Sequence, residues 1–448
     1  MNSLIMTTPY NEPAAAMPAL ARAADTAPTA KAADAAPVAT PASTWLASWT
    51  ASPQPIWGPD FLFPSNVPAV LRDQTVRQVA RISLGGPRLR IVLSNAYGAR
   101  PLTVGGATVA LSGGEAAVVA DSLRTVTFDG RTSATIAPGA PLLSDPVELP
   151  VAALARVAIS LYLPGETPVT TFHWDGRQTG WIVPGNRTAA PDLDAARYPG
   201  QSTTARLLLS GIEVEATSSA RAVAVIGDSI TDGATASLDA DSRWPDFLAA
   251  RLASHGVAVI NAGISGGRLL SDGMGVNALA RLERDVLAQP GVRSVVVLLG
   301  INDIAWPGTA FEPQAARPTL EALIAGYRQL IERARSRGLR VIGATLTPFA
   351  GALPSPLEDY YHTDKDALRR QVNAWIRDSG AFDAVIDFDA VLRDPADPER
   401  IDPRFDSGDR LHPGDAGNRA MAEAIDVAVL LPGLGTRPNP IPETSQER

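Results

Sequence analysis

The chain has 448 residues, a net charge of −8, 19% charged residues and no cysteine. The absence of cysteine excludes disulfides, thiolate metal sites and cysteine nucleophiles. No Lys/Arg-rich run indicates a nucleic-acid partner, and no apolar run approaches the roughly 18 residues of a membrane span.

The two ends of the chain are predicted to lie outside the folded domains. Residues 1–43 are rich in Ala, Pro and Thr, which is typical of a disordered leader. They lack the basic start and apolar run of a complete secretory signal. We hypothesise that the protein is secreted or periplasmic and that its true start lies upstream. Residues 434–448 are predicted to be a flexible tail.

Residues 44–215 have the pattern of an all-β domain. Short segments rich in Val, Ile and Thr alternate apolar with polar positions, and turns with Gly, Pro or Asn separate them. This texture predicts a β-sandwich, jelly-roll-like domain. The predicted strands are 75–84, 88–95, 102–111, 122–128 and 155–163.

Residues 216–433 have a different pattern, in which continuous apolar runs alternate with amphipathic segments. Such runs are typical of parallel strands that are buried on both faces. Helical periodicity appears over 320–334 and 368–376. We therefore predict a three-layer α/β/α domain with a parallel sheet. Its predicted strands are 221–227, 257–263, 294–300, 339–348 and 384–388.

Polar residues follow the predicted parallel strands at the edge where such sheets bind ligands. Ser229 follows the first strand, Gly263 ends the second, and Asn302 follows the third. Asp409 and His412 come after the last strand, before a helical C-terminal segment. We expect these five residues to gather at one edge of one sheet.

These residue types suit acyl transfer. A serine hydroxyl needs a base to remove its proton, and His412 can do so while Asp409 fixes the tautomer of the imidazole. The oxyanion needs preorganised donors. The candidates are the backbone N–H groups of Ser229 and Gly263 and the side-chain amide of Asn302. This chemistry requires no metal and no organic cofactor.

Four motifs resemble the SGNH (GDSL) hydrolases, in the same order: GDSIT, NAGISG, GIND and DRLH followed by Pro. The resemblance covers about residues 220–430, and its first block has Ile in place of Leu. It implies a carboxylic ester hydrolase with Ser229 as nucleophile and oxyanion donor, Gly263 and Asn302 as further donors, and Asp409 and His412 completing the triad. With its N-terminal β domain, the chain is similar to bacterial esterases linked to plant-polysaccharide deacetylation.

Three alternatives stay open. Ser265 lies in a G-x-S-x-G motif, the nucleophile turn of α/β-hydrolases, and competes with Ser229. The substrate is expected to be a small-molecule or a polysaccharide ester, so a polysaccharide O-deacetylase of the acetylxylan type is the second reading. A non-catalytic carbohydrate-binding protein is the third. The oligomeric state does not follow from the sequence.

The other histidines are interpreted as structural. His255 ends a helix-like segment, where a cation suits the helix dipole. His362 is expected at the surface. His173 is assigned to the packing at the edge of the β-sandwich, although the neighbouring Trp174 and Trp181 could line the rim of a site.

Overall fold

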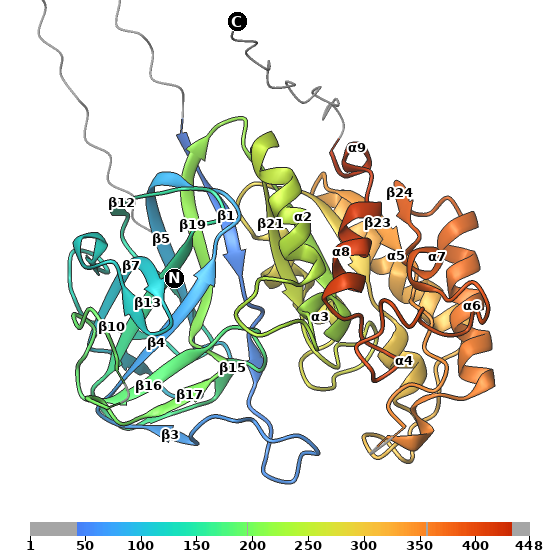
Figure 1. The fold of residues 1–448 in the computed structure, drawn as a ribbon, viewed down its shortest axis with the longest axis horizontal. Helices are drawn as coiled ribbons and strands as arrows, with labels where there is room; N and C mark the ends of the chain where they lie inside the picture. The colour runs from blue at the N-terminus through green and yellow to red at the C-terminus, as the bar shows by residue number, and fades with distance from the viewer. Residues whose placement is uncertain (1–42, 195, 355–356, 432–448) are drawn as a thin grey trace, which may run out of the picture. The chain divides into compact units, whose positions relative to one another are not determined.

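The computed structural model describes residues 43–431 except 195, 355 and 356. The predicted leader, apart from Ser43, and the predicted tail lie outside these residues. Contacts group the described residues into one compact unit. Within it, a β-rich N-terminal region precedes an α/β region, coloured blue to green and green to red in Figure 1.

Two antiparallel sheets dominate the β-rich region. The first contains β1 (Ser43–Thr50), β19 (Leu209–Thr217), β5 (Gly86–Ser94), β11 (Pro141–Leu143) and β12 (Val147–Val151). The second contains β17 (Gln201–Thr203), β16 (Gly180–Pro184), β4 (Gln74–Arg81), β13 (Arg156–Leu163), β7 (Gly106–Gly114), β8 (Ala117–Val118) and β9 (Arg124–Val126). Small sheets join β2 (Gln54–Pro55), β15 (Thr171–His173) and β18 (Arg206–Leu207); β3 (Val70–Leu71) and β14 (Thr167–Pro168); and β6 (Leu102–Val104) and β10 (Ala134–Ile136).

The first strand of this region closes against its last. β1 pairs antiparallel with β19, from Ser43 opposite Thr217 to Thr50 opposite Gly211. The sequence pattern did not predict β1, because its aromatic and turn-forming residues mask the apolar side chains that it buries. The strands predicted over 75–84, 88–95 and 155–163 are confirmed as β4, β5 and β13.

The single strand predicted over 102–111 is wrong, because the structure divides it at Gly105 into β6 and β7. β6 pairs with β10, whereas β7 pairs with β13. The Gly105 N–H donates to the Tyr162 carbonyl at 2.8 Å, and a Cβ here would lie 2.9 Å from Pro164 Cγ. Glycine therefore lets the chain pass close to β13 as it changes sheets.

The α/β region is built on five parallel strands, as its apolar runs predict. Their order is β21 (Val257–Gly263), β20 (Arg221–Gly227), β22 (Val292–Leu298), β23 (Arg340–Ala344) and β24 (Ala384–Ile386). In β20 every residue after Arg221 is buried. Because β20 lies between β21 and β22 and all three strands run parallel, the loops that follow them open on the same edge of the sheet.

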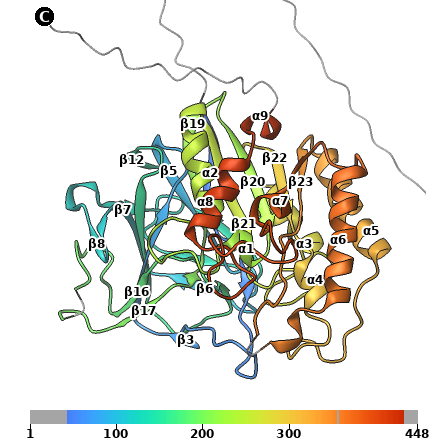
Figure 2. The ribbon, with the colours of Figure 1, turned by 45° about the vertical axis from the view of Figure 1, so that its right-hand side comes forward.

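Helices pack beside this sheet. α2 packs against β21 and α8, and α5 packs against β23 and α6 (Figure 2). No helix within the described residues is long and apolar enough to span a membrane. The helices are α1 (Ser229–Asp232), α2 (Trp244–Leu252), α3 (Ala278–Leu282), α4 (Ile301–Ala305), α5 (Leu320–Ser336), α6 (Thr363–Asp378), α7 (Phe388–Leu392), α8 (Asp415–Ala424) and α9 (Val427–Leu430), with single turns η1 (Ala120–Ser122), η2 (Ala253–His255), η3 (Glu283–Leu287) and η4 (Glu358–Tyr360).

The β-rich region contacts the α/β region at strand β21. The Thr50 hydroxyl donates to the Asn261 carbonyl at 3.0 Å, and the buried Ser83 hydroxyl donates to the Val259 carbonyl at 2.6 Å. β1 also packs along β21. The β-rich region is therefore fixed to the strand that leads into one of the predicted site loops.

Candidate active site

Ser229 lies at the first position of α1, directly after β20. Asp228 caps this helix, because its Oδ1 accepts the N–H of Ile230 at 3.0 Å. A Cβ at Gly227 would lie 2.1 Å from Thr231 Oγ1 and 2.9 Å from the Leu298 carbonyl oxygen. Glycine at this position thus allows the helix to start close to the strand, which places Ser229 at the carboxyl end of the sheet.

His412 and Asp409 are held in one loop before α8. Asp409 Oδ1 accepts the backbone N–H groups of Leu411 at 2.9 Å and of His412 at 2.8 Å. Its other oxygen, Oδ2, lies 2.6 Å from His412 Nδ1. The carboxylate therefore both shapes the loop and orients the imidazole ring.

The three side chains form one hydrogen-bonded chain. His412 Nε2 lies 2.8 Å from Ser229 Oγ, although the two residues are far apart in sequence. Ser229 is 8% exposed, and the side chains of His412 and Asp409 are 12% and 26% exposed. The three side chains are thus mostly buried, and Asp409, at the end of the series, is the most exposed. With Nδ1–H donated to Asp409, Nε2 can accept the serine proton.

The carboxylate of Asp409 stays ionised. Burial alone would raise its pKa, but the hydrogen bond from His412 and the charge of that ring outweigh burial and hold the pKa well below its usual value. Asp409 therefore remains a hydrogen-bond acceptor for Nδ1–H throughout the weakly acidic and neutral range.

Asn302 lies in α4, after β22, with a fixed side-chain orientation. Its Oδ1 accepts the hydroxyl of Tyr360 at 2.8 Å, and its Nδ2 donates to the Gly267 carbonyl at 3.1 Å. Burial raises the pKa of Tyr360 well above its usual value, so this hydroxyl remains a donor. One Nδ2 hydrogen of Asn302 has no partner among the described residues. Sequence reasoning missed Tyr360, because nothing local links it to Asn302.

The prediction of Gly263 as an oxyanion donor needs correction. Its N–H donates to Asn261 Oδ1 at 2.8 Å, and Asn261 Nδ2 in turn donates to the Thr231 carbonyl at 2.7 Å. Gly263 is therefore a structural residue of the strand end. Gly266 lies in the same loop, and its N–H has no hydrogen-bond partner within the described part of the chain. A Cβ on the next residue, Gly267, would lie 3.6 Å from Asp228 Cα, so this turn borders the start of α1.

The competing nucleophile, Ser265, lies in a different setting. Its hydroxyl donates to Asp232 Oδ2 at 2.8 Å, and its N–H donates to the same oxygen at 2.9 Å. Ser265 is 4% exposed, and no imidazole contacts its hydroxyl among the described residues. The geometry therefore favours Ser229 over Ser265.

Asp228 is buried beside the candidate nucleophile. Burial raises its pKa to about 7, although the Ile230 N–H opposes this shift. Its Oδ2 has no hydrogen-bond partner among the described residues. The charged form is thus disfavoured in the folded chain. Ionising Asp228 in the folded chain therefore lowers the free energy of unfolding. This loss is absent below the pKa of the unfolded chain, about 4, grows as the pH rises, and is complete above the folded-state pKa.

Asp228→Asn is therefore expected to stabilise the fold at pH 8 and not at pH 4. Asparagine keeps the Oδ1 acceptor for Ile230 and removes the buried charge, with a gain in unfolding free energy of about 1–3 kcal/mol at pH 8. Denaturant unfolding at both pH values measures it. Asp121→Asn, at an exposed position, serves as the control. An equal effect of Asp228→Asn at the two pH values would contradict the prediction.

A serine, an imidazole and a carboxylate in hydrogen-bonded series are the parts on which serine hydrolases depend. Residues 225–420 match the GDSL-like Lipase/Acylhydrolase family. This match lies within the α/β region and covers less than half of the chain, and it supports a carboxylic ester hydrolase. No curated relative matches the chain.

Three solved structures that are similar to this chain each cover less than half of it. A GDSL-like lipase from Bacteroides thetaiotaomicron has 20% identity and a TM-score of 0.35, over 47% of this chain and 87% of that one. A carbohydrate acetylesterase from Sinorhizobium meliloti has 18% identity and a TM-score of 0.35, over 46% and 95%. An acetylxylan esterase from Geobacillus stearothermophilus has 24% identity and a TM-score of 0.34, over 46% and 91%.

Proposed function

We propose that the protein is a serine esterase whose triad is Ser229, His412 and Asp409. The observation that carries this proposal is the continuous series of hydrogen bonds from Ser229 Oγ through His412 to Asp409, at 2.8 Å and 2.6 Å. Ser229 attacks the ester carbonyl while His412 takes its proton and passes it to the leaving alcohol. Water, activated by the same imidazole, then releases the acyl group.

The oxyanion donors in this proposal are the N–H groups of Ser229 and Gly266 and the free Nδ2 hydrogen of Asn302. The turn at residues 266–267 connects them, because Gly267 borders Asp228 and accepts a hydrogen bond from Asn302. The Tyr360 hydroxyl fixes the amide so that Nδ2 faces this turn. These donors would be in place before negative charge develops on the carbonyl oxygen.

We also propose that residues 44–215 form a β-sandwich domain and residues 216–433 a three-layer α/β/α domain. The antiparallel sheets of the first and the parallel sheet of the second support this division. The packing of α2 against β21 and of α5 against β23 supports the layered arrangement.

A small-molecule ester is the proposed substrate, with O-acetyl groups of a polysaccharide as the alternative. A cluster of aromatic side chains supports the polysaccharide alternative. Trp306 stacks on Phe311 with ring centroids 4.2 Å apart, and Phe63 stacks on Trp174 at 5.7 Å. A Cβ on Gly266 would lie 2.7 Å from Trp306, so the cluster borders the proposed oxyanion site. Trp306 itself is buried, and the half-buried rings of Phe63, Trp174 and Phe311 are the members of the cluster that can contact a sugar ring.

A serine-reactive fluorophosphonate probe tests the proposed function. We expect the probe to label Ser229, as located by peptide mapping, and to abolish hydrolysis of p-nitrophenyl esters. Comparing esters of increasing acyl length with acetylated xylan then separates the two substrate classes. A chain that binds xylan but is not labelled would instead be a carbohydrate-binding protein.

Asn302→Ala is expected to lower kcat by roughly 10²–10³-fold and to change KM little, because the amide contacts the oxyanion chiefly in the transition state. Steady-state kinetics on p-nitrophenyl acetate measures both constants. Asn277→Ala removes another asparagine of the same region, one that caps α3, and should lower stability without lowering kcat. Similar kcat losses in the two variants would contradict the role of Asn302 as an oxyanion donor.

A further inference from the structure

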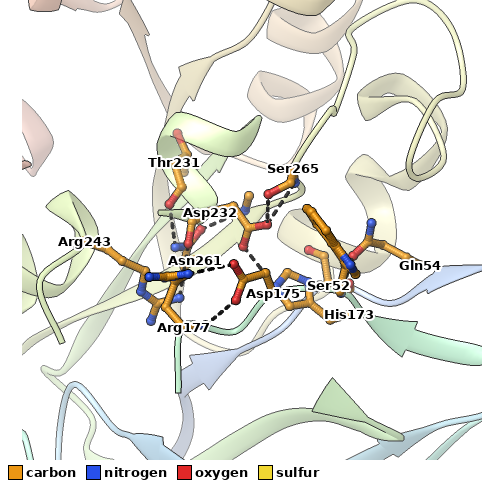
Figure 3. Close-up of polar contacts among 12 residues, drawn as sticks. Ser52, Gln54, His173, Asp175, Arg177, Thr231, Asp232, Arg243, Asn261 and Ser265 are labelled. Carbon is orange, nitrogen blue, oxygen red and sulfur yellow. Dashed lines mark hydrogen bonds and ion pairs between the residues drawn. The ribbon is translucent and has the colours of Figure 1, made fainter. Parts of the chain in front are cut away.

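A second series of buried polar groups lies beside the proposed triad and crosses between the two regions of the chain. His173 is the last residue of β15 in the β-rich region, and Asp232 is the last residue of α1. His173 Nε2 lies 3.0 Å from Asp232 Oδ1, and the two side chains are 6% and 2% exposed. Figure 3 shows the ring directed at the carboxylate, with Ser265 on the opposite side.

Both ring nitrogens of His173 face acceptors. Nδ1 lies 3.1 Å from the Ser52 carbonyl oxygen, which can only accept, and Nε2 faces the Asp232 carboxylate. The ring therefore lies between two acceptors, and its Nε2 side is paired with the carboxylate of Asp232. Burial alone would raise the pKa of Asp232, but the charge and hydrogen bond of His173, with Ser265 and Arg243, outweigh it and lower the pKa.

The second oxygen of Asp232 holds the loop after β21. Oδ2 accepts both the N–H and the hydroxyl of Ser265, at 2.9 and 2.8 Å. Ser265 directly precedes Gly266, and Asp232 ends the helix that begins with Ser229. One carboxylate thus sets the spacing between the helix that carries the nucleophile and the turn that carries the proposed donor.

The β-rich region contacts the same loop at a second point. Gln54 Nε2 donates to the Met274 carbonyl at 2.8 Å, and its Oε1 accepts the N–H of Trp174 at 2.8 Å. Gln54 belongs to β2, which pairs with β15. A small sheet of the β-rich region therefore contacts the loop over 264–275 at Met274 directly and at Ser265 through Asp232.

We propose that His173 is a positioning residue for catalysis, which acts through Asp232 and Ser265 to hold the Gly266 N–H in place for the oxyanion. This proposal rests on the proposed esterase function. It gives the β-rich region a part in the reaction, although none of its residues in this series needs to touch the substrate. His173 acts on the transition state and not on ground-state binding, so its loss should lower kcat and leave KM nearly unchanged.

Two replacements of His173 form a matched pair. In asparagine the side-chain nitrogen can take the place of Nδ1, so His173→Asn keeps a donor for Ser52 and loses the donor for Asp232. In glutamine the side-chain nitrogen can take the place of Nε2, so His173→Gln keeps the donor for Asp232. We expect His173→Asn to lower kcat roughly 10–100-fold, in the range of a misplaced catalytic group, and His173→Gln to recover most of that loss.

Ser83→Ala is the structural control. It also removes a buried hydrogen bond between the regions, the one from Ser83 to the Val259 carbonyl, at a distance from the Ser265 turn along β21. Its unfolding temperature should fall while kcat stays within about twofold. Equal kcat values for His173→Asn and His173→Gln, or a kcat loss in Ser83→Ala that matches that of His173→Asn, would overturn the positioning role.

Ser265→Ala tests the same series without disturbing the interface, and it decides the question if His173→Asn does not fold. We expect it to lower kcat roughly tenfold, and its effect should not multiply with that of His173→Asn in the double variant. An unchanged kcat in Ser265→Ala, or fully multiplicative losses, would contradict the proposal. Failure of the esterase function would show elsewhere, as turnover that Ser229→Ala retains.

Discussion

Replacing Ser229 by alanine is expected to lower kcat by roughly 10⁴–10⁶-fold. Without Oγ, His412 has no hydroxyl to deprotonate, and no acyl-enzyme can form. The loss of one hydroxyl should leave the fold intact, because the Asp228 cap of α1 uses the Ile230 N–H and not the serine side chain. The measurement is turnover of p-nitrophenyl acetate, with thermal unfolding to verify the fold.

Ser265→Ala is the matched control for this experiment. Both serines follow a parallel strand, but within the described part of the chain only Ser229 contacts an imidazole. Ser265→Ala should therefore lower kcat only about tenfold, far less than Ser229→Ala. Turnover retained by Ser229→Ala and abolished by Ser265→Ala would transfer the role of nucleophile to Ser265.

The second large effect is expected for Asp409→Asn, at about 10⁴-fold in kcat. The asparagine oxygen can still accept the N–H groups of Leu411 and His412, so the loop should keep its shape. Its amide nitrogen would donate to His412 Nδ1, which moves the ring proton to Nε2. In that tautomer the ring presents a donor to Ser229 and cannot act as a base.

Asp406→Asn provides the control in the same loop. Asp406 Oδ1 accepts the N–H groups of Gly408 at 3.0 Å and Arg410 at 2.9 Å, a loop-shaping role that asparagine can keep. Its kcat should stay within about twofold of the parent value, since it makes no contact with the imidazole. A kcat loss in Asp406→Asn as large as that in Asp409→Asn would mean that loop geometry, and not the tautomer, explains the effect.

Local patterns predicted the α/β region well. The apolar runs over 221–227 and 257–263 are strands β20 and β21, and they pair in parallel as expected. An apolar run followed directly by a polar cluster can be recognised within a few residues of sequence, and it predicts a buried strand with site residues after it. The edge at which the polar clusters meet follows from the parallel topology alone. For this reason Ser229 and His412 could be placed together before their distance was known.

The choice between two glycines could not be made from the sequence. Gly263 ends strand β21 and Gly266 lies in the loop after it, and either N–H could face a substrate. The outcome depends on Asn261, whose side chain folds back onto Gly263 because its own Nδ2 is held by the Thr231 carbonyl. An asparagine two residues before a glycine at a strand end is a local sign that this N–H is already bonded.

The contribution of the β-rich region was also beyond local reasoning. Local sequence patterns assign His173 to packing at the edge of the sandwich, because no nearby residue indicates a carboxylate partner. Asp232 lies in a different region, and only the fold brings the two together. Likewise, β1 could be recognised only through its pairing with β19 at the far end of the region.

The buried pair of His173 and Asp232 limits how this architecture can be recombined. Exchange of one half of the chain for that of a homologue, with the breakpoint between β19 and β20, would separate the imidazole from its carboxylate partner. Leaving the buried Asp232 carboxylate without its partner costs about 3–5 kcal/mol, a large share of the stability of an ordinary domain. Chimeras should therefore survive only when both members of the pair are inherited from one parent or are replaced together.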